Sequence, residues 1–172
     1  MSELHLVDGY NILHKCSWLK SLLRHDLETA REALIDKVAH FCSHSGTRVT
    51  IVFDGRGRKI PEKVAHNRSV GSLKILYSPS QLTADSVIER MVYETPRKMD
   101  VVVVTNDRGV RDLCRGMGAL VMDAQNFLSC IQESSRATSE TVKRTQAPMP
   151  HHLGDRLDAS SLEALDRLRK KL

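Results

Sequence analysis

The sequence has few of the residues and none of the motifs that mark several common protein classes. Aromatic residues make up 4% of the 172 residues, and the four cysteines are scattered without a C-x-x-C pair. This spacing argues against a zinc knuckle and a disulfide framework, so we expect reduced thiols. The absence of G-x-G-x-x-G and Walker-type loops argues against a dinucleotide-dependent dehydrogenase and an NTPase.

Long apolar runs are also missing. No window approaches the roughly 20 apolar residues that a membrane-spanning helix needs. The first residues, MSELHLVDGYN, are acidic where a secretory signal would be basic. We therefore expect a cytoplasmic protein with no membrane partner.

His40 and His44 have a spacing that permits zinc, but no second ligand pair completes a site, and we interpret them as surface residues.

The overall composition is that of a globular domain with a basic surface. Hydrophobic residues make up 41% of the chain and charged residues 27%, which is ordinary for a folded protein. The formal net charge is +5, with a pI near 9.2. A basic chain favours a polyanionic partner, because phosphates release counterions when cations bind them.

Strand-like and helix-like segments alternate along residues 4–131. Short apolar or β-branched runs predict strands at 4–7, 49–53, 73–77, 101–104 and 119–122. Helical spacing and capping residues predict helices at about 11–23, 26–44, 83–95, 107–115 and 123–131. A glycine follows Asp8, and we expect a tight turn there. The alternation predicts a three-layer α/β domain with a mainly parallel sheet.

The C-terminal part has a different composition. Residues 134–150 are rich in Ser, Thr, Gln and Pro, which predicts a polar linker or frayed segment. Residues 158–172 return to helical spacing, with leucines on one side and a basic end. We therefore divide the chain into a domain of residues 1–133 and a tail of residues 134–172. The oligomeric state is left open.

Four aspartates occupy corresponding places in this pattern. Asp8, Asp54 and Asp107 each follow a predicted strand, and Asp85 lies in the first turn of a predicted helix. The carboxyl ends of parallel strands meet at one sheet edge, so these carboxylates can converge there. Converging carboxylates suit a hard divalent cation such as Mg²⁺. Each aspartate taken alone has a structural explanation as a turn former or helix cap.

Three further polar residues are candidates for supporting roles. Glu89 follows Asp85 by four residues and can share its helix face, although a solvated position is the simpler interpretation. Asp112 falls on a different side of its helix from Asp107, and it can support the metal-binding acids from behind or pair with Arg108 or Arg111. Asn11 can orient a phosphate or a metal-bound water, or serve as a helix cap.

A basic stretch follows Asp54 and is the best candidate for phosphate contacts. It contains five cations against one acid, Glu62: Arg56, Arg58, Lys59, Lys63 and Arg68. Arg108, directly after Asp107, is a further candidate. A basic surface loop can equally be a solvated one. Base stacking would fall on the scarce aromatic residues Tyr10, Trp18 and Tyr77, which can equally belong to the core.

Four segments together resemble a known family. They are DGYNIL at Asp8–Leu13, VFDG at Val52–Gly55, TADSVIE at Thr83–Glu89 and VVTNDRGVRD at Val103–Asp112. In order and spacing they are similar to the YacP-type NYN domains, which are PIN-like ribonucleases with a ribosome-associated messenger-RNA endonuclease as bacterial member. The resemblance covers about residues 3–133. It implies a PIN-like α/β/α sandwich with a five-stranded sheet in the order 3-2-1-4-5.

The resemblance also implies a site. Asp8, Asp85 and Asp107 match the catalytic, metal-binding acids, and Asn11 and Asp54 match further motif positions. Ser86 departs from the family pattern, which often has a second acid there. The implied activity is metal-dependent cleavage of single-stranded RNA by water activated on Mg²⁺ or Mn²⁺, with the ribosome as a further partner. Because the metal would supply the activated water, no histidine base is required, and this agrees with histidines that lie away from the motifs.

Two other functions remain open. Loss of efficient metal binding would leave a non-catalytic RNA- or ribosome-binding module, and Ser86 supports this alternative. A phosphatase of the haloacid dehalogenase type is disfavoured, because its D-x-D pattern would require an aspartate where Tyr10 stands.

Overall fold

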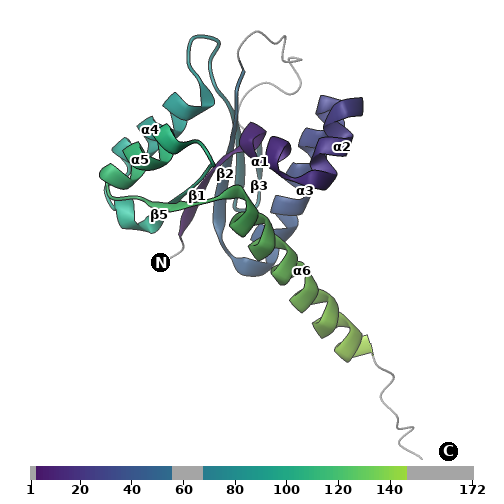
Figure 1. Ribbon diagram of the computed structural model, residues 1–172. Helices are drawn as coiled ribbons and strands as arrows, with labels where there is room; N and C mark the ends of the chain where they lie inside the picture. The colour runs from purple at the N-terminus through teal and green to yellow at the C-terminus, as the bar shows by residue number, and fades with distance from the viewer. Residues whose placement is uncertain (1–2, 56–67, 147–172) are drawn as a thin grey trace, which may run out of the picture. The chain divides into compact units, whose positions relative to one another are not determined.

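The structure is a computed structural model that describes residues 3–55 and 68–146, with side chains described at 3–55 and 71–137 (Figure 1). The strands are β1 (Leu4–Asp8), β2 (Arg48–Phe53), β3 (Arg68–Val70), β4 (Leu73–Tyr77), β5 (Val101–Val104) and β6 (Leu120–Met122). The helices are α1 (Gly9–Lys15), α2 (Ser17–His25), α3 (Leu27–Ser45), α4 (Ala84–Glu94), α5 (Arg108–Gly116) and α6 (Ala124–Gln146), with a 3-10 turn at Lys98–Asp100.

Five strands form a parallel sheet in the order β4-β2-β1-β5-β6. In the numbering of the five predicted strands this is 3-2-1-4-5, so the predicted fold is confirmed. Strand β1 pairs with β2, where Asp8 lies opposite Val52, and with β5, where Val7 lies opposite Val104. From β1 the chain adds β2 and β4 on one side of the sheet and then β5 and β6 on the other side, so the strand order reverses between β1 and β5. Ligand crevices of open α/β sheets lie at such a switch point.

A sixth strand, β3, extends the sheet beyond β4 and was not predicted. It pairs antiparallel with β4, where Val70 lies opposite Leu73, and Gly71 turns the chain between them with φ +59°. The segment is short and polar, so it carries no apolar alternation that periodicity could detect. Arg68, predicted within a basic loop, therefore has its backbone in a strand.

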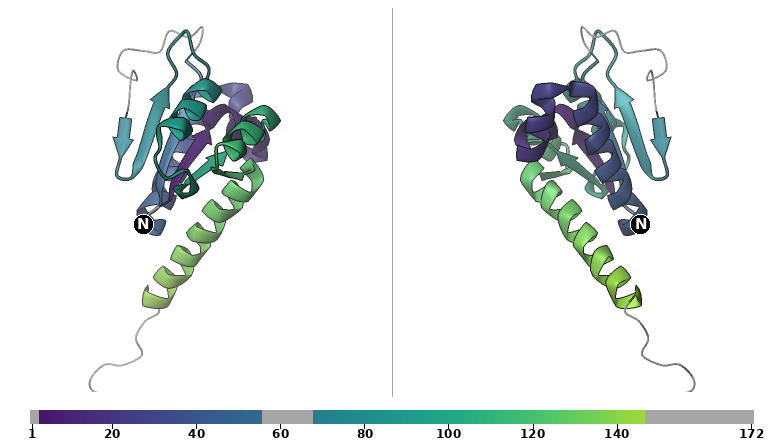
Figure 2. Two further views of the ribbon diagram at one scale, coloured as in Figure 1. Left: turned by 90° about the vertical axis from the view of Figure 1, so that its left-hand side faces the viewer. Right: turned by 90° about the vertical axis from the view of Figure 1, so that its right-hand side faces the viewer.

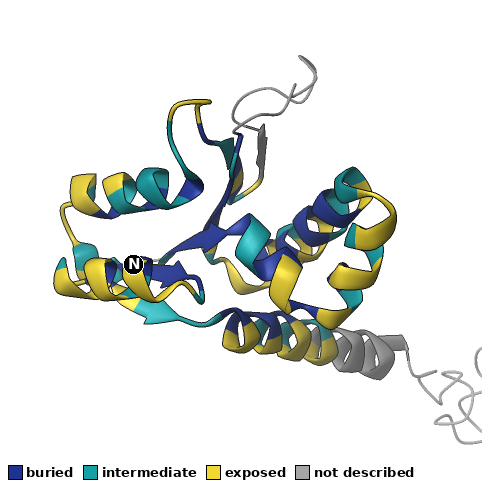
Figure 3. Cartoon of the chain, turned by 45° about the horizontal axis from the view of Figure 1, so that its top comes forward, coloured by how far each residue is buried: buried dark blue, intermediate teal, exposed yellow. Residues whose placement is uncertain are grey.

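Helices cover both faces of the sheet, which confirms the three-layer arrangement (Figure 2). On one face, α1, α2, α3 and the start of α6 pack against the sheet around residues such as Leu13, Leu34 and Phe127. On the other face, α4 and α5 pack around Ile88 and Val110. The central strands are buried along their length, while the outward sides of the helices are exposed (Figure 3).

The predicted helix 11–23 is two helices. Cys16, with φ −85° and ψ 120°, ends α1 and begins α2. The break redirects the chain so that Leu13 of α1 and Leu19 of α2 both become fully buried. Local spacing did not reveal this break, because the apolar residues on either side of it satisfy one helical pattern almost equally well.

The predicted tight turn at Asp8-Gly9 is absent. Gly9 is the first residue of α1, and it is not among the glycines with positive φ. A Cβ atom on Gly9 would lie 2.3 Å from Cε1 of Phe53 in β2. The glycine is therefore required by the close approach of α1 to β2, which places the helix start directly at the end of β1.

Helix α6 continues to Gln146, past the predicted end at Ile131. Residues 134–146 contain no glycine or proline, and a Ser- and Thr-rich composition alone does not stop a helix. By internal contacts the chain divides into units Met1–Thr138 and Ser139–Leu172. The predicted boundary at residue 133 stays a prediction, and the predicted helix 158–172 lies outside the described residues. No helix in the described ranges has the length and apolarity to span a membrane.

Candidate functional site at the carboxyl edge of the sheet

Asp8 is a buried carboxylate at the end of the central strand β1. Its side chain is the N-cap of α1: Oδ1 accepts a hydrogen bond from the Asn11 N–H at 3.1 Å. Oδ2 accepts one from the Thr105 hydroxyl at 3.3 Å, just beyond β5. The capping role that the sequence allowed is thus present. Two neighbouring strand ends hold this carboxyl group in place.

The electrostatic environment of Asp8 is unfavourable for a negative charge. Burial is the main cause that raises the pKa of Asp8 from 3.8 to about 6. The charges of Asp85 and Asp107 raise this pKa further, while the hydrogen bonds from Asn11 and Thr105 act in the opposite direction. The folded protein therefore keeps three carboxylates close enough to repel one another.

Asp85 and Asp107 come to this edge from helices on the other face of the sheet. Asp107 is the N-cap of α5, where Oδ1 accepts from the Val110 N–H at 3.1 Å. Asp85 lies in the first turn of α4, which begins after Thr83, whose hydroxyl accepts from the Ser86 N–H at 3.0 Å. Burial first, and then the charges of Asp107 and Asp54, raise the pKa of Asp85.

Asp54 completes the acidic group. It follows β2, the strand that pairs with β1, and is half-buried. Its Oδ1 lies 3.5 Å from the hydroxyl of Ser78, a buried residue directly after β4. The same hydroxyl accepts the Gly55 N–H at 3.0 Å. Ser78 thus fixes the chain where it leaves β2.

Asn11 has a structural role that links three elements. Its Oδ1 accepts from the Asn106 N–H at 3.0 Å, and Asn106 Oδ1 in turn accepts from the Ala124 N–H at 2.8 Å. These bonds join α1, the loop after β5 and the start of α6. The Asp107 N–H donates to the Thr105 hydroxyl at 3.2 Å. Side-chain amides and hydroxyls therefore hold the two central strand ends in register.

A cleft of about 320 Å³ opens beside Asp8, Asp54 and Asp85, and Asp107 is not among its lining residues. Helix α1 forms one wall, the start of α4 forms the other, and the strand ends form the floor. Its lining residues are Asp8, Tyr10, Asn11, His14, Lys15, Asp54, Thr83, Ala84 and Asp85. The volume lies at the lower end of the range of small-molecule sites, which suits a hydrated cation with a phosphate group.

The donor atoms in this cleft are of the type that a hard divalent cation prefers, but they do not form a complete ligand set. They are carboxylate oxygens, and their mutual repulsion would be offset by a cation. Within residues 3–55 and 68–146, however, no group of three or more His, Cys, Asp or Glu side chains is arranged to hold a metal ion. Mg²⁺ commonly uses only one or two carboxylates together with water. The residues therefore fit a cation held by part of the acidic group through water.

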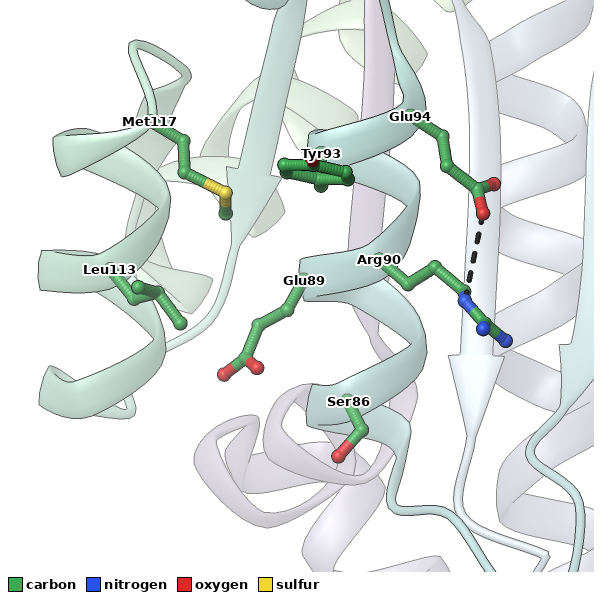
Figure 4. Close-up of a pocket in the computed structure, with 7 residues that line it drawn as sticks. All are labelled: Ser86, Glu89, Arg90, Tyr93, Glu94, Leu113 and Met117. Carbon is green, nitrogen blue, oxygen red and sulfur yellow. Dashed lines mark ion pairs between the residues drawn. The ribbon is translucent and has the colours of Figure 1, made fainter.

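Two of the predicted supporting acids lie elsewhere. Glu89 lines a different groove, of about 450 Å³, between α4 and α5, together with Tyr93 and Leu113 (Figure 4). Asp112 is exposed on α5 and pairs with Arg115 at 3.5 Å instead of with Arg108 or Arg111. Neither residue lines the cleft beside Asp8.

The predicted RNA contacts are largely not described. Arg56, Arg58, Lys59 and Lys63 lie outside the described residues, and for Arg68 only the backbone is described, in β3. Arg108 is exposed on the first turn of α5, next to Asp107.

Two basic side chains at the site were not predicted. His14 and Lys15, exposed in the last turn of α1, line the cleft, although they stand just outside the motif Asp8–Leu13. The available signal was spacing: both follow Asn11 by three and four residues and so share its helix face. Thr105 and Asn106 were also missed, although they stand within the quoted motif around Asp107.

The chain is similar in sequence to known proteins. The chain matches the family model described as the YacP-like NYN domain over residues 5–170, which extends beyond the resemblance recognised at residues 3–133. It is 30% identical over 149 residues to the protein YacP of Bacillus subtilis strain 168, with 86% of each chain covered.

Solved structures agree. The crystal structure of Rae1 (YacP) from Bacillus subtilis matches with a TM-score of 0.71 and 30% identity, covering 99% of this chain and 94% of that one. A Trp-to-Leu mutant of the same protein matches with a TM-score of 0.71 and 27% identity, covering 89% of each chain. The family model spans most of the chain and the solved relatives share its fold, so the chain belongs to the YacP-like NYN domain family.

Proposed function

We propose that this protein is a metal-dependent endoribonuclease that cleaves single-stranded RNA in the cytoplasm. The observation that carries the proposal is the gathering of Asp8, Asp54, Asp85 and Asp107 at one sheet edge, where they perturb one another's charge. Asp8 is buried, Asp54 and Asp85 are half-buried and Asp107 is exposed. A buried carboxylate beside other carboxylates costs folding free energy without a cation, so its presence favours a function that uses the charge. Membership of the NYN family supports a nuclease-like, RNA-related function.

Mg²⁺ or Mn²⁺ would be held by Asp8 with Asp85 or Asp107, completed by water. When bound, such a cation lowers the pKa of a coordinated water and neutralises charge on the phosphate oxygens. Hydrolysis by water leaves a 5′-phosphate on the downstream product.

The chain's own residues supply position and charge. The Asn11 N–H and the Thr105 hydroxyl fix the orientation of the Asp8 carboxyl group. The Asn11 side chain is held by the Asn106 backbone and so maintains the spacing of β1 and β5. Arg108 and the basic residues 56–68 are proposed to contact RNA phosphates, and the proposal includes a ribosome as the partner that presents the RNA.

A non-catalytic RNA- or ribosome-binding module is the second candidate. One observation favours it: Ser86, at the position where the family often has an acid, forms hydrogen bonds with Thr83 and so serves the helix cap. With fewer carboxylates the affinity for a cation would be lower. This candidate requires RNA binding without any metal-dependent product.

Cleavage of 5′-labelled single-stranded RNA with Mn²⁺, Mg²⁺ or EDTA tests the proposal. We expect products only with a divalent cation, and none from Asp8→Asn. Asp36→Asn is the matched control, because Asp36 is an exposed aspartate on α3 outside the cleft. Equal cleavage by purified Asp8→Asn and wild type would refute the nuclease assignment. Binding without products under every condition would favour the second candidate.

A further inference from the structure

The two walls of the acidic cleft differ in charge. The α4 wall consists of Thr83, Ala84 and Asp85, and the floor carries Asp8 and Asp54. The α1 wall presents Tyr10 and Asn11 and then two basic side chains in its last turn, His14 and Lys15. The cleft is therefore polarised, with anionic groups on its floor and α4 side and basic groups on its α1 side.

The two basic side chains have no polar partner among the described residues. His14 and Lys15 are both exposed, and neither forms a hydrogen bond or an ion pair with any described residue. Arg31, a buried cation nearby, contrasts with them: it pairs with Glu28 and donates to the Tyr10 hydroxyl at 3.5 Å. Lys15 thus lies beside a cleft with three carboxylates without neutralising any of them.

The helix dipole alone does not account for the position of these two basic residues. Basic residues in a last helical turn interact favourably with the helix dipole, and this explains why basic residues stand at the end of α1. The same explanation applies to Arg24 and His25, the exposed basic pair in the last turn of α2. Only the α1 pair lines the cleft. The ends of α1 and α2 thus carry similar basic pairs, and only the pair on α1 lies beside the acids.

We propose that His14 and Lys15 bind the phosphate backbone of single-stranded RNA along the α1 wall, next to the phosphate that lies over the acids. The inference rests on the proposed function and adds to it the side of the cleft on which the strand runs. A strand bound this way has its backbone against the basic wall, while the carboxylates on the floor and α4 side remain available for a cation. The α1 wall would thus hold the RNA backbone, and a cation on the floor would offset the charge of the phosphate.

The test is RNA binding measured without cleavage. Fluorescence anisotropy of a short labelled single-stranded RNA in EDTA, over a range of salt concentrations, reports affinity and its salt dependence. Each phosphate contact contributes about 0.7 to the slope of log K against log salt for single strands. Lys15→Ala should reduce the slope by about 0.7, which corresponds to about fivefold weaker binding at roughly 0.1 M salt and no difference near 1 M. The double variant His14→Ala/Lys15→Ala should bind more weakly still.

The controls are Arg24→Ala and the double variant Arg24→Ala/His25→Ala, which remove the same chemistry from the end of α2. The midpoint temperature of thermal unfolding should fall by a similar amount in both double variants, because each loses basic residues that interact with a helix dipole. Affinity and slope should fall only in the α1 variants. Equal slopes in Lys15→Ala and Arg24→Ala, or no RNA binding by the wild type, would overturn the inference. If Lys15→Ala weakens binding but Asp8→Asn still cleaves, the binding wall stands and the nuclease proposal fails.

Discussion

Asp8→Asn should make the protein more stable above neutral pH while removing its activity. The folded state raises the pKa of Asp8 from 3.8 to about 6, mainly through burial. The folded protein therefore holds this proton more tightly than the unfolded chain does. The stability that Asp8 contributes is complete below about pH 4 and is lost as the pH rises through about 6.

The size of the effect follows from the pKa. Each unit corresponds to about 1.36 kcal/mol, so the ionised Asp8 side chain costs the fold about 3 kcal/mol above pH 7. An asparagine has no such cost, because its carbonyl can accept from the Asn11 N–H and its amide can donate to the Thr105 hydroxyl. The variant should gain about 3 kcal/mol over wild type between about pH 4 and pH 8.

Urea unfolding followed by circular dichroism, in EDTA at several pH values, measures this difference. The Asp36→Asn control removes an exposed carboxylate and should show no such gain. The other acids titrate in both proteins, so the difference between the two curves isolates Asp8 and its immediate neighbours. Parallel curves for wild type and Asp8→Asn across this pH range would refute the reasoning that burial and the neighbouring carboxylates disfavour a charge on Asp8.

Three further results are expected. Gly9→Ala should destabilise the fold by about 1–3 kcal/mol in urea unfolding, because its Cβ would lie 2.3 Å from the Phe53 ring; an unchanged midpoint would contradict the close approach. Thr83→Ala should cost about 0.5–2 kcal/mol through the lost α4 cap and also slow cleavage, since that turn carries Asp85. Burial lowers the pKa of His5, so stability should fall as the pH drops through about 6.5, and His5→Gln should remove that part of the acid sensitivity.

The sheet could be predicted because its signals are local. The four valines of β5 and the apolar runs of β1, β2 and β4 each indicate a buried strand without reference to the rest of the chain. Parallel topology then brings their carboxyl ends together. The convergence of Asp8, Asp54, Asp85 and Asp107 follows from this rule, as their mutual effects on pKa show.

The parts that could not be predicted depend on contacts between distant segments. The break at Cys16 and the role of Gly9 are set by packing against β2 and α3, which no local pattern contains. Strand β3 is defined by its partner β4 and has no apolar alternation of its own. Glu89 shares a helix with Asp85, but it lines the groove beside α5 instead of the acidic cleft.

Calorimetric titration of Mn²⁺ into wild type, Asp8→Asn and Asp36→Asn, each with a non-cleavable single-stranded RNA analogue present, tests most directly whether the gathered carboxylates exist to hold a cation. Wild type and Asp36→Asn should bind the ion with equal affinity, and Asp8→Asn should show no saturable heat. Equal binding by all three proteins would mean that the ion is held elsewhere, and no binding by any of them would remove the cation from the mechanism.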